Sequence, residues 1–152
     1  MKKTLLSPNL IIKKAEKTDI NKIAEIFRKG YIEEPYNENW TEENSLKKIK
    51  DYYNNSKMLI IAENNNIIGF LIYYKMIWDN KIKLYINEIV VLKEFRNQGI
   101  GTRLLNEAEK AAEKENINNI ELASHIKSKA FHLYQKLGYK ESGLVIMEKI
   151  IK

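Results

Sequence analysis

The hydrophobic and polar positions in the first part of the chain predict one strand followed by two helices. Residues 9–15 are rich in apolar side chains and predict a short strand. Thr18 and Asp19 supply an N-cap and an acidic first turn for a helix, and Gly30 is a plausible stop for it. After an aromatic and acidic connection, a threonine can cap a second helix over residues 41–53. The apolar stripe of the first helix follows the 3.6-residue period and consists of Ile20, Ile23, Ala24, Ile26 and Phe27.

The rest of the chain predicts a three-stranded antiparallel meander, then a helix, a strand, a helix and terminal strands. Asparagine-rich and Asp-Asn segments supply the turns of the meander. No repeat or linker interrupts this order, so the fold class is α/β with a mixed sheet. The expected elements are strands at 58–62, 67–78 and 83–92, a helix at 99–114, a strand at 120–123, a helix at 128–137 and a strand pair within 139–151.

The composition is that of an ordinary globular domain. Hydrophobic residues make up 44% and charged residues 30% of the chain, which excludes a disordered or fibrous protein and fits a single domain over residues 1–152. There is no cysteine, so disulfides, thiolate metal sites and a covalent cysteine intermediate are excluded. The apolar run that contains Gly69 to Tyr74, and that begins at Ile67, is too short to span a membrane, and the basic start does not resemble a signal peptide. A cytoplasmic protein without a membrane partner is therefore expected.

The net charge of +6, from 26 Lys and Arg against 20 Asp and Glu, raises the question of nucleic-acid binding. The arginines are only Arg28, Arg96 and Arg103, and the lysines are spread along the chain without one dominant cluster. Proteins that bind bases or phosphates usually favour arginine and gather their charges in a patch. We therefore expect no nucleic-acid partner.

The most informative stretch is a strand that leads directly into a glycine-containing loop and a long helix. Backbone N–H groups at a helix start lack intrahelical acceptors, and Gly99 and Gly101 let an anion approach them closely. The spacing fits neither of the two common nucleotide-binding motifs, and the glycines could instead only shape the turn. The pattern predicts an anion site formed by Arg96, Asn97, Gln98, Gly99, Ile100, Gly101 and Thr102.

Two motifs of the chain resemble those of the GCN5-related N-acetyltransferases (GNAT). Arg96-x-x-Gly99-x-Gly101 resembles motif A of the family, and the segment from Ala130 to Tyr139 is similar to its later motif A-x-x-L-Y-x-K-x-G-F. The predicted order of elements along the whole chain also resembles the family. The resemblance implies the GNAT fold and acetyl-CoA as the acetyl donor, bound through its pyrophosphate at the loop, with no metal. Lys127 departs from the family, which often has asparagine there, and would either reach the phosphates or face water.

The resemblance also implies a catalytic apparatus for direct attack of an amine on the thioester. The strand edge formed by Ile89, Val90 and Val91 would pair with the pantetheine arm of the donor. Glu88 would remove a proton from the amine, although it could instead be a strand glutamate that faces solvent. Tyr134 would protonate the departing thiolate, and its alternative is a tyrosine that only packs in the core. The family often dimerises, so a homodimer is a further expectation.

The acceptor side of the family's cleft directs attention to residues 33–43, which contain five carboxylates and no Lys or Arg. Such a segment would favour a cationic amine, with the aromatic rings adding cation–π contacts. The candidate substrate-binding residues are Glu34, Tyr36, Glu38 and Trp40. The alternative is an acidic surface loop with Trp40 in the core. We expect acetyl transfer to a small cationic primary amine; a protein or peptide N-acetyltransferase and a catalytically silent CoA-binding regulatory module remain alternatives.

Overall fold

The computed structural model describes residues 8–55 and 58–151, and the expectation about a signal peptide at the N-terminus lies outside these ranges. The order of elements agrees with the predicted order up to the last helix. Within the described ranges, no helix is long and apolar enough to cross a bilayer. The elements are β1 (Ile11–Lys14), α1 (Ile20–Tyr31), α2 (Glu42–Asn54), β2 (Met58–Asn64), β3 (Asn66–Trp78), β4 (Lys81–Val91), α3 (Ile100–Lys114), β5 (Ile120–Leu122) and α4 (Lys129–Lys136).

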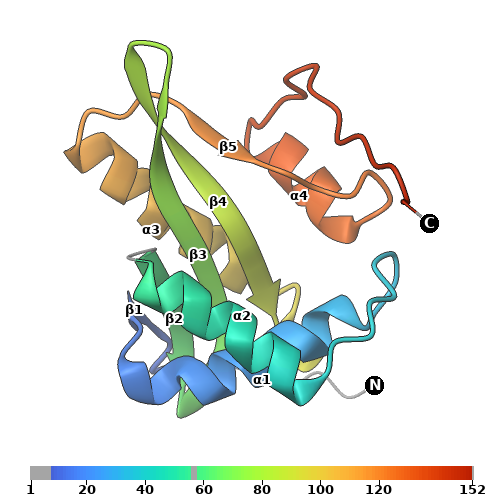
Figure 1. Ribbon diagram of the computed structural model, residues 1–152. Coiled ribbons are helices and arrows are strands. Elements are labelled where there is room, and N and C mark those ends of the chain that lie inside the picture. The colour runs from blue at the N-terminus through green and yellow to red at the C-terminus, as the bar shows by residue number, and fades with distance from the viewer. Residues whose placement is uncertain (1–7, 56–57, 152) are drawn as a thin grey trace.

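The strands form one mixed sheet whose spatial order, β1-β2-β3-β4-β5, follows the chain (Figure 1). The first four strands pair antiparallel, and β5 joins β4 in parallel after the crossover through α3. Asn65 and Asp79 occupy the two hairpin turns with φ of 63° and 56°, a backbone conformation that Asn and Asp tolerate better than most residues. The predicted meander is therefore confirmed.

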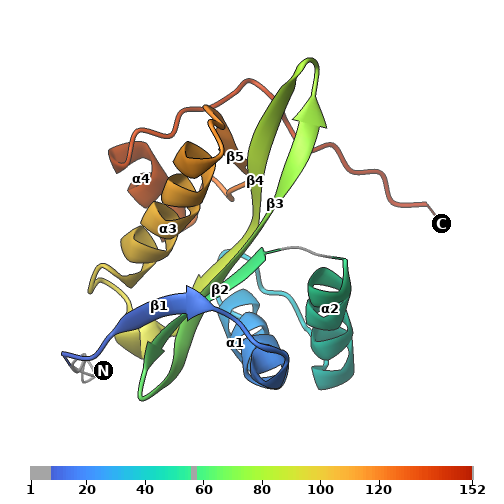
Figure 2. The same cartoon turned by 90° about the vertical axis from the view of Figure 1, so that its left-hand side faces the viewer.

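Helices cover both faces of the sheet and create two hydrophobic cores (Figure 2). The apolar stripes predicted from the 3.6-residue period face these cores. The core beneath α1 and α2 includes the fully buried Ile23, Phe27, Ile49, Phe70 and Ile72. The core beneath α3 and α4 includes the buried Leu84, Leu104, Leu105, Ala108 and Tyr134.

The starts of the helices follow the capping signals only in part. Thr41 accepts a hydrogen bond from the Asn44 backbone N–H at 3.1 Å, which confirms it as the cap of α2. Asp19 stands at the N-cap position of α1, but its carboxylate instead accepts a hydrogen bond from the Glu16 backbone N–H. This bond closes a 3-10 turn that precedes the helix.

Two expectations about where elements end are wrong. Gly30 does not stop α1, which continues for one more residue, Tyr31. The glycine instead allows close packing against β4, where a Cβ atom would clash with Val90. The predicted strand pair within 139–151 does not form, and residues 140–151 belong to no helix or strand. The apolar side chains of this segment lie in solvent, and the short β5 offers little edge for them to pair with.

Candidate active site

The site is centred on a bulge in β4. Ile86 pairs with Tyr73 of β3, but Glu88 pairs with Ile72, so Asn87 is an extra residue in β4. The bulge changes the face to which the following side chains point. Glu88 consequently faces α1 and α2, where it contacts residues of both helices.

The sheet also opens at this level. β5 pairs with β4 only through Leu84, Tyr85 and Ile86, and the chain leaves the sheet after Leu122. Among the described residues, no strand pairs with Glu88–Val91 on this side of β4. The strand edge predicted to receive the donor thus has backbone groups available for another extended molecule.

Glu88 is a buried carboxylate held by groups from two helices. Its side chain accepts hydrogen bonds from the Tyr31 hydroxyl and, at 2.7 Å, from the Tyr52 hydroxyl. Lys48 Nζ lies 3.4 Å from the same carboxylate oxygen that Tyr52 contacts. Only 7% of Glu88 is exposed, so the expectation that it might be a solvent-facing strand residue is wrong.

The two tyrosines are kept neutral by their surroundings. Burial, followed by the nearby charge of Glu88, raises the pKa of Tyr31 and of Tyr52 far above the ordinary value of 10.0. Both hydroxyls therefore remain hydrogen-bond donors to the carboxylate at neutral pH. Tyr31 is the last residue of α1, and Tyr52 lies one turn beyond Lys48 on α2, so the close packing of these two helices assembles the group.

Aromatic rings surround the Lys48 ammonium. The nitrogen lies 5.2 Å from the ring centroid of Trp40 and 5.5 Å from those of Phe27 and Tyr52. Phe27 and Trp40 pack edge to face at 4.9 Å, which fixes two walls of this box. Glu88 and the three rings together form a site that holds an ammonium group, here the one that belongs to Lys48.

The glycine loop places backbone donors beside this opening. Gly99 has φ of 80° and stands at the N-cap position of α3, where it has no side chain with which to cap the helix. The first hydrogen bond of α3 runs from the Arg103 N–H to the Gly99 carbonyl. The N–H groups of Ile100, Gly101 and Thr102 precede it and have no intrahelical acceptor. The arrangement is suited to an anion, because the dipole of α3 adds to these donors.

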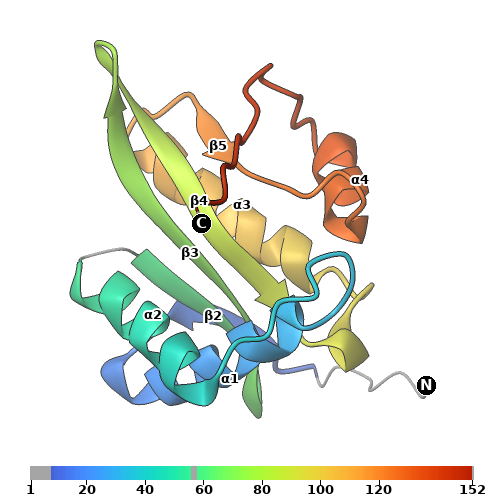
Figure 3. The same ribbon diagram turned by 45° about the vertical axis from the view of Figure 1, so that its right-hand side comes forward.

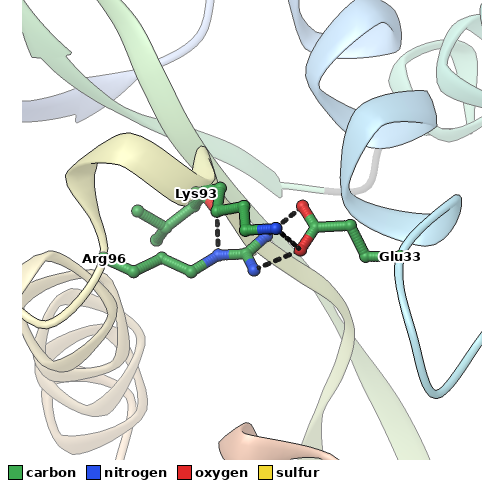
Figure 4. Close-up of polar contacts among 4 residues, drawn as sticks. Glu33, Lys93 and Arg96 are labelled. Atoms are coloured by element: carbon green, nitrogen blue, oxygen red, sulfur yellow. Dashed lines mark hydrogen bonds and ion pairs between the residues drawn. The ribbon is translucent and has the colours of Figure 1, made fainter. Parts of the chain in front are cut away.

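Arg96 is engaged within the protein. Its Nε donates to the Val91 carbonyl at 2.7 Å, and its two terminal nitrogens donate to Glu33 at 2.9 and 3.1 Å (Figure 4). Lys93 Nζ lies 3.9 Å from the same carboxylate. The guanidinium therefore joins the end of β4 to the chain that follows α1, and the backbone N–H groups of α3 are left as the principal anion donors.

Tyr134 lies on α4 and packs in the core beneath α3 and α4, on the face of the sheet opposite to the one on which Glu88 contacts α1 and α2. Ser128 caps α4 by accepting a hydrogen bond from the Phe131 N–H at 3.1 Å. Burial raises the pKa of Tyr134, with smaller effects from Tyr36 and Tyr139, so its hydroxyl stays protonated at neutral pH. Its ring lies 5.8 Å from that of Tyr139. The position is compatible both with packing and with proton donation.

The acidic connection between α1 and α2 lies between the end of β4 and α4 (Figure 3). Tyr36 contacts Tyr31 at 5.0 Å between ring centroids and reaches His125, from the loop before α4, at 6.1 Å. Glu38 accepts a hydrogen bond from the Trp40 indole, and Glu34 is exposed. Of the four predicted substrate-binding residues, Trp40 is the one whose ring lies beside the Lys48 ammonium. The same ring also packs on the core.

The sequence analysis did not identify Phe27, Tyr31, Lys48 and Tyr52 as site residues. The spacing of Lys48 and Tyr52 does place them on one face of α2, but nothing in the sequence shows that this face meets Glu88. Lys127 is exposed, in agreement with its expected alternative of facing water. Within the described ranges, no three His, Cys, Asp or Glu side chains gather as metal ligands.

Comparisons with known proteins identify the fold. The model of the acetyltransferase (GNAT) family matches residues 20–139. A comparison with curated proteins finds no match. Among solved structures, a possible acetyltransferase from Clostridium difficile 630 matches with a TM-score of 0.80 and 21% identity, over 94% of this chain and 98% of that chain.

Two further solved structures were determined with acetyl-CoA or CoA. A predicted acetyltransferase from Clostridium acetobutylicum, with acetyl-CoA, matches with a TM-score of 0.75 and 22% identity over 92% of this chain and 96% of that chain. An aminoglycoside N-acetyltransferase in complex with CoA matches with a TM-score of 0.76 and 17% identity, over 95% of this chain and 99% of that chain. At such identities the likeness shows a common fold.

Proposed function

Because the chain belongs to the acetyltransferase (GNAT) family, we propose that it transfers the acetyl group of acetyl-CoA directly to a primary amine on a small cationic molecule. The observation that carries the acceptor class is the box around Lys48. Glu88 and three aromatic rings already hold an ammonium group there, so the same surroundings suit the ammonium of a substrate. The acidic connection between α1 and α2 adds attraction for a cation.

The donor would bind along β4 and at the start of α3. The free N–H groups of Ile100, Gly101 and Thr102 are suited to its pyrophosphate, with Asn97, Gln98 and Gly99 shaping the loop. The unpaired edge at Ile89, Val90 and Val91 is suited to its pantetheine arm, which carries amide groups. Arg96 would act mainly by holding this loop against Val91 and Glu33, since its guanidinium is already bound there.

In the proposed reaction Glu88 and Tyr134 move protons on opposite sides of the opening. Glu88 accepts a proton from the acceptor ammonium, which frees the nitrogen lone pair to attack the thioester carbon. The bond between carbon and sulfur then breaks, and Tyr134 supplies a proton to the departing sulfur. The acylated nitrogen loses its second proton, which restores Tyr134, and Glu88 returns its proton to solvent. The Tyr134 hydroxyl is protonated at neutral pH, and Tyr31 and Tyr52 hold the Glu88 carboxylate in position.

Two measurements test this function. Thermal unfolding with acetyl-CoA or CoA should show a raised midpoint, because ligands that bind the native state stabilise it. Release of free thiol from acetyl-CoA should then require an amine, supplied in separate pools of polyamines, aminoglycosides and short peptides. Turnover with short peptides alone would favour a peptide N-acetyltransferase instead.

Variants assign the two proton-transfer roles. Glu88→Gln and Tyr134→Phe should each slow thiol release by about 100-fold, the usual contribution of one acid or base. Tyr139→Phe is a matched control, because this tyrosine neighbours Tyr134 but donates its hydroxyl towards Glu109. Binding of acetyl-CoA without turnover for any amine would favour a silent CoA-binding module.

We also propose that the protein is a homodimer. Support comes from the C-terminal segment, residues 144–151, which ends away from the helices and strands in Figure 2. Its first four residues are consecutive apolar side chains, a pattern typical of a strand covered on both faces. The exposed apolar side chains of the segment, 68–89% exposed, are Leu144, Val145, Ile146, Met147, Ile150 and Ile151. Packing of this segment against a second copy would cover them.

A further inference from the structure

Lys48 places a primary amine of the protein itself beside the proposed catalytic base. Its nitrogen lies 3.4 Å from Glu88 and inside the ring box, whereas its neighbours Lys47 and Lys50 on α2 are exposed. A general base must lie within about 2.6–3.2 Å of the atom whose proton it removes. The distance from the Lys48 nitrogen to Glu88 is therefore only a few tenths of an ångström longer than the distance that an acceptor nitrogen requires.

The rest of the arrangement also suits Lys48 as an acceptor. The side chain approaches from α2, on the face of the sheet to which Glu88 points, and about a third of it is exposed. Glu88 is followed directly by the unpaired edge of β4 to which the donor is assigned. The flexible four-carbon stem lets the Lys48 nitrogen change position without movement of the backbone.

We propose that Lys48 is a site of autoacetylation, on the basis of the function proposed above. Glu88 accepts one proton from the Lys48 ammonium, and the freed nitrogen attacks the thioester carbon of acetyl-CoA. A carbon–nitrogen bond forms as the carbon–sulfur bond breaks, and the thiolate takes a proton from Tyr134. The acylated nitrogen then loses its second proton, which restores Tyr134, and Glu88 returns its proton to solvent. The products are acetyl-Lys48 and CoA, and no oxidant or further reactant is needed.

The modification would change the acceptor site itself. Acetyl-Lys48 carries no charge, so its ion pair with Glu88 and its cation–π contacts are lost. The added acetyl group would occupy the ring box that a substrate ammonium must enter. Prolonged exposure to acetyl-CoA without an acceptor should therefore reduce the rate at which amines are subsequently acetylated.

Peptide mass spectrometry of the full chain tests the proposal. After incubation with acetyl-CoA alone, acetylation of Lys48 should be roughly 100-fold faster than that of Lys47 or Lys50, the contribution expected from one general base. The two exposed lysines serve as internal controls for uncatalysed acetylation. Because the three lysines are compared within the wild-type chain, this test does not depend on the folding of a variant. Equal rates at the three lysines would overturn the proposal.

Two further measurements connect the modification to the site. Glu88→Gln should reduce acetylation of Lys48 to the rate of Lys47, and added spermidine should slow it by competing for the same box. After preincubation with acetyl-CoA, the wild-type enzyme should lose activity. The activity of Lys48→Arg should be the same with and without preincubation. Acetylation of an added amine with Lys48 unmodified would overturn this proposal alone, whereas transfer to no amine at all would overturn the proposed function as well.

Discussion

Glu88 shows how much of a residue's chemistry is decided by partners distant in sequence. Its hydroxyl donors come from α1 and α2, and its cationic neighbour is also on α2. A buried carboxylate requires such partners, since an isolated charge away from water is strongly unfavourable. The hydroxyls of Tyr31 and Tyr52 should consequently contribute to stability as well as to the position of the carboxylate.

Tyr52→Phe tests this contribution. The variant keeps the ring that faces Lys48 and removes only the hydroxyl that contacts Glu88 at 2.7 Å. The free energy of unfolding should fall by about 1.5–3 kcal/mol, the usual contribution of a hydrogen bond to a charged group. Urea unfolding measures the change.

The neighbouring tyrosine provides the control for this variant. Tyr53 packs beside the same core, and Tyr53→Phe should change the free energy of unfolding by less than about 0.5 kcal/mol. A Tyr52→Phe protein as stable as the Tyr53→Phe protein would mean that the hydroxyl does not stabilise the buried carboxylate.

The sequence could indicate Glu88 and Tyr134 as candidates, because each stands beside or within a motif that resembles the family's. It could not indicate that Tyr31, Lys48 and Tyr52 meet Glu88. That meeting depends on the bulge at Asn87, which directs Glu88 towards α1 and α2, and strict alternation along a strand does not predict where an extra residue enters.

The hydrophobic periods predicted the helices and strands of the chain up to α4. They did not predict how closely these elements pack against one another. Gly30 illustrates the difference. A Cβ atom at this position of α1 would lie 2.4 Å from Cγ1 of Val90 in β4, far inside van der Waals contact. A glycine after the apolar stripe predicted a stop at Gly30, whereas in the structure it is the penultimate residue of α1 and allows the helix to approach β4 closely.

Gly30→Ala should therefore weaken both the fold and donor binding. Val90 is β-branched and stiff, so the clash would move α1 or β4, at about 1–3 kcal/mol for such overpacking. The gain in helix propensity from Gly to Ala, about 1 kcal/mol, offsets part of this loss. Thermal unfolding with and without acetyl-CoA should show a lower midpoint and a smaller stabilisation by the ligand.

Gly101→Ala is the matched control for the stability of the free protein. Its added Cβ would lie 3.7 Å from Leu133, an ordinary contact, and Gly101 is also helical. The unliganded variant should unfold at the wild-type temperature or slightly above it. If Gly30→Ala behaved in the same way, the close approach of α1 and β4 would not be a constraint on the fold.

For the whole molecule, the unpaired C-terminal segment is the largest departure from the predicted architecture. A consecutive apolar run predicted strands there, and the side chains do have that character, but no strand of the same chain pairs with them within the described ranges. Pattern alone cannot say whether the partner of a strand belongs to the same chain or to another copy.

The proposed dimer predicts a mass twice that of the chain in size-exclusion chromatography with light scattering. Ile146→Lys should convert it to a monomer, because a charge would then lie in the covered face. Ile77→Lys, at an equally exposed apolar position near the tip of the β3–β4 hairpin, should leave the dimer intact. A monomeric wild-type protein, or equal loss of the dimer in both variants, would contradict this assembly.

The molecule should also lose stability in alkaline solution. Burial raises the pKa of Tyr31 and Tyr134 in the folded state above the ordinary 10.0, so the unfolded chain releases these protons first. Their contribution is present below pH 10.0 and declines as the pH rises beyond it. Above that pH each neutral tyrosine should lower the free energy of unfolding by about 1.4 kcal/mol per pH unit.

Urea unfolding between about pH 8 and pH 11 measures this decline, and tyrosinate absorbance of the folded protein follows ionisation directly. Tyr134→Phe should reduce the slope above pH 10.0, since the phenylalanine has no proton to release. Full ionisation of every tyrosine in the folded protein near that pH would contradict the prediction.

The order of the strands in the sheet has a consequence for the kinetics of folding. β1 to β4 pair with neighbours in the sheet order, and the β2–β3–β4 hairpins require only short loops to close. The β4–β5 pairing must wait for all of α3 and its flanking loops to be ordered, which makes its loop-closure entropy larger. The meander that carries Glu88 can thus form early, while the β4–β5 pairing beside the opening follows it, and a donor bound across β4 and α3 as proposed would stabilise that pairing.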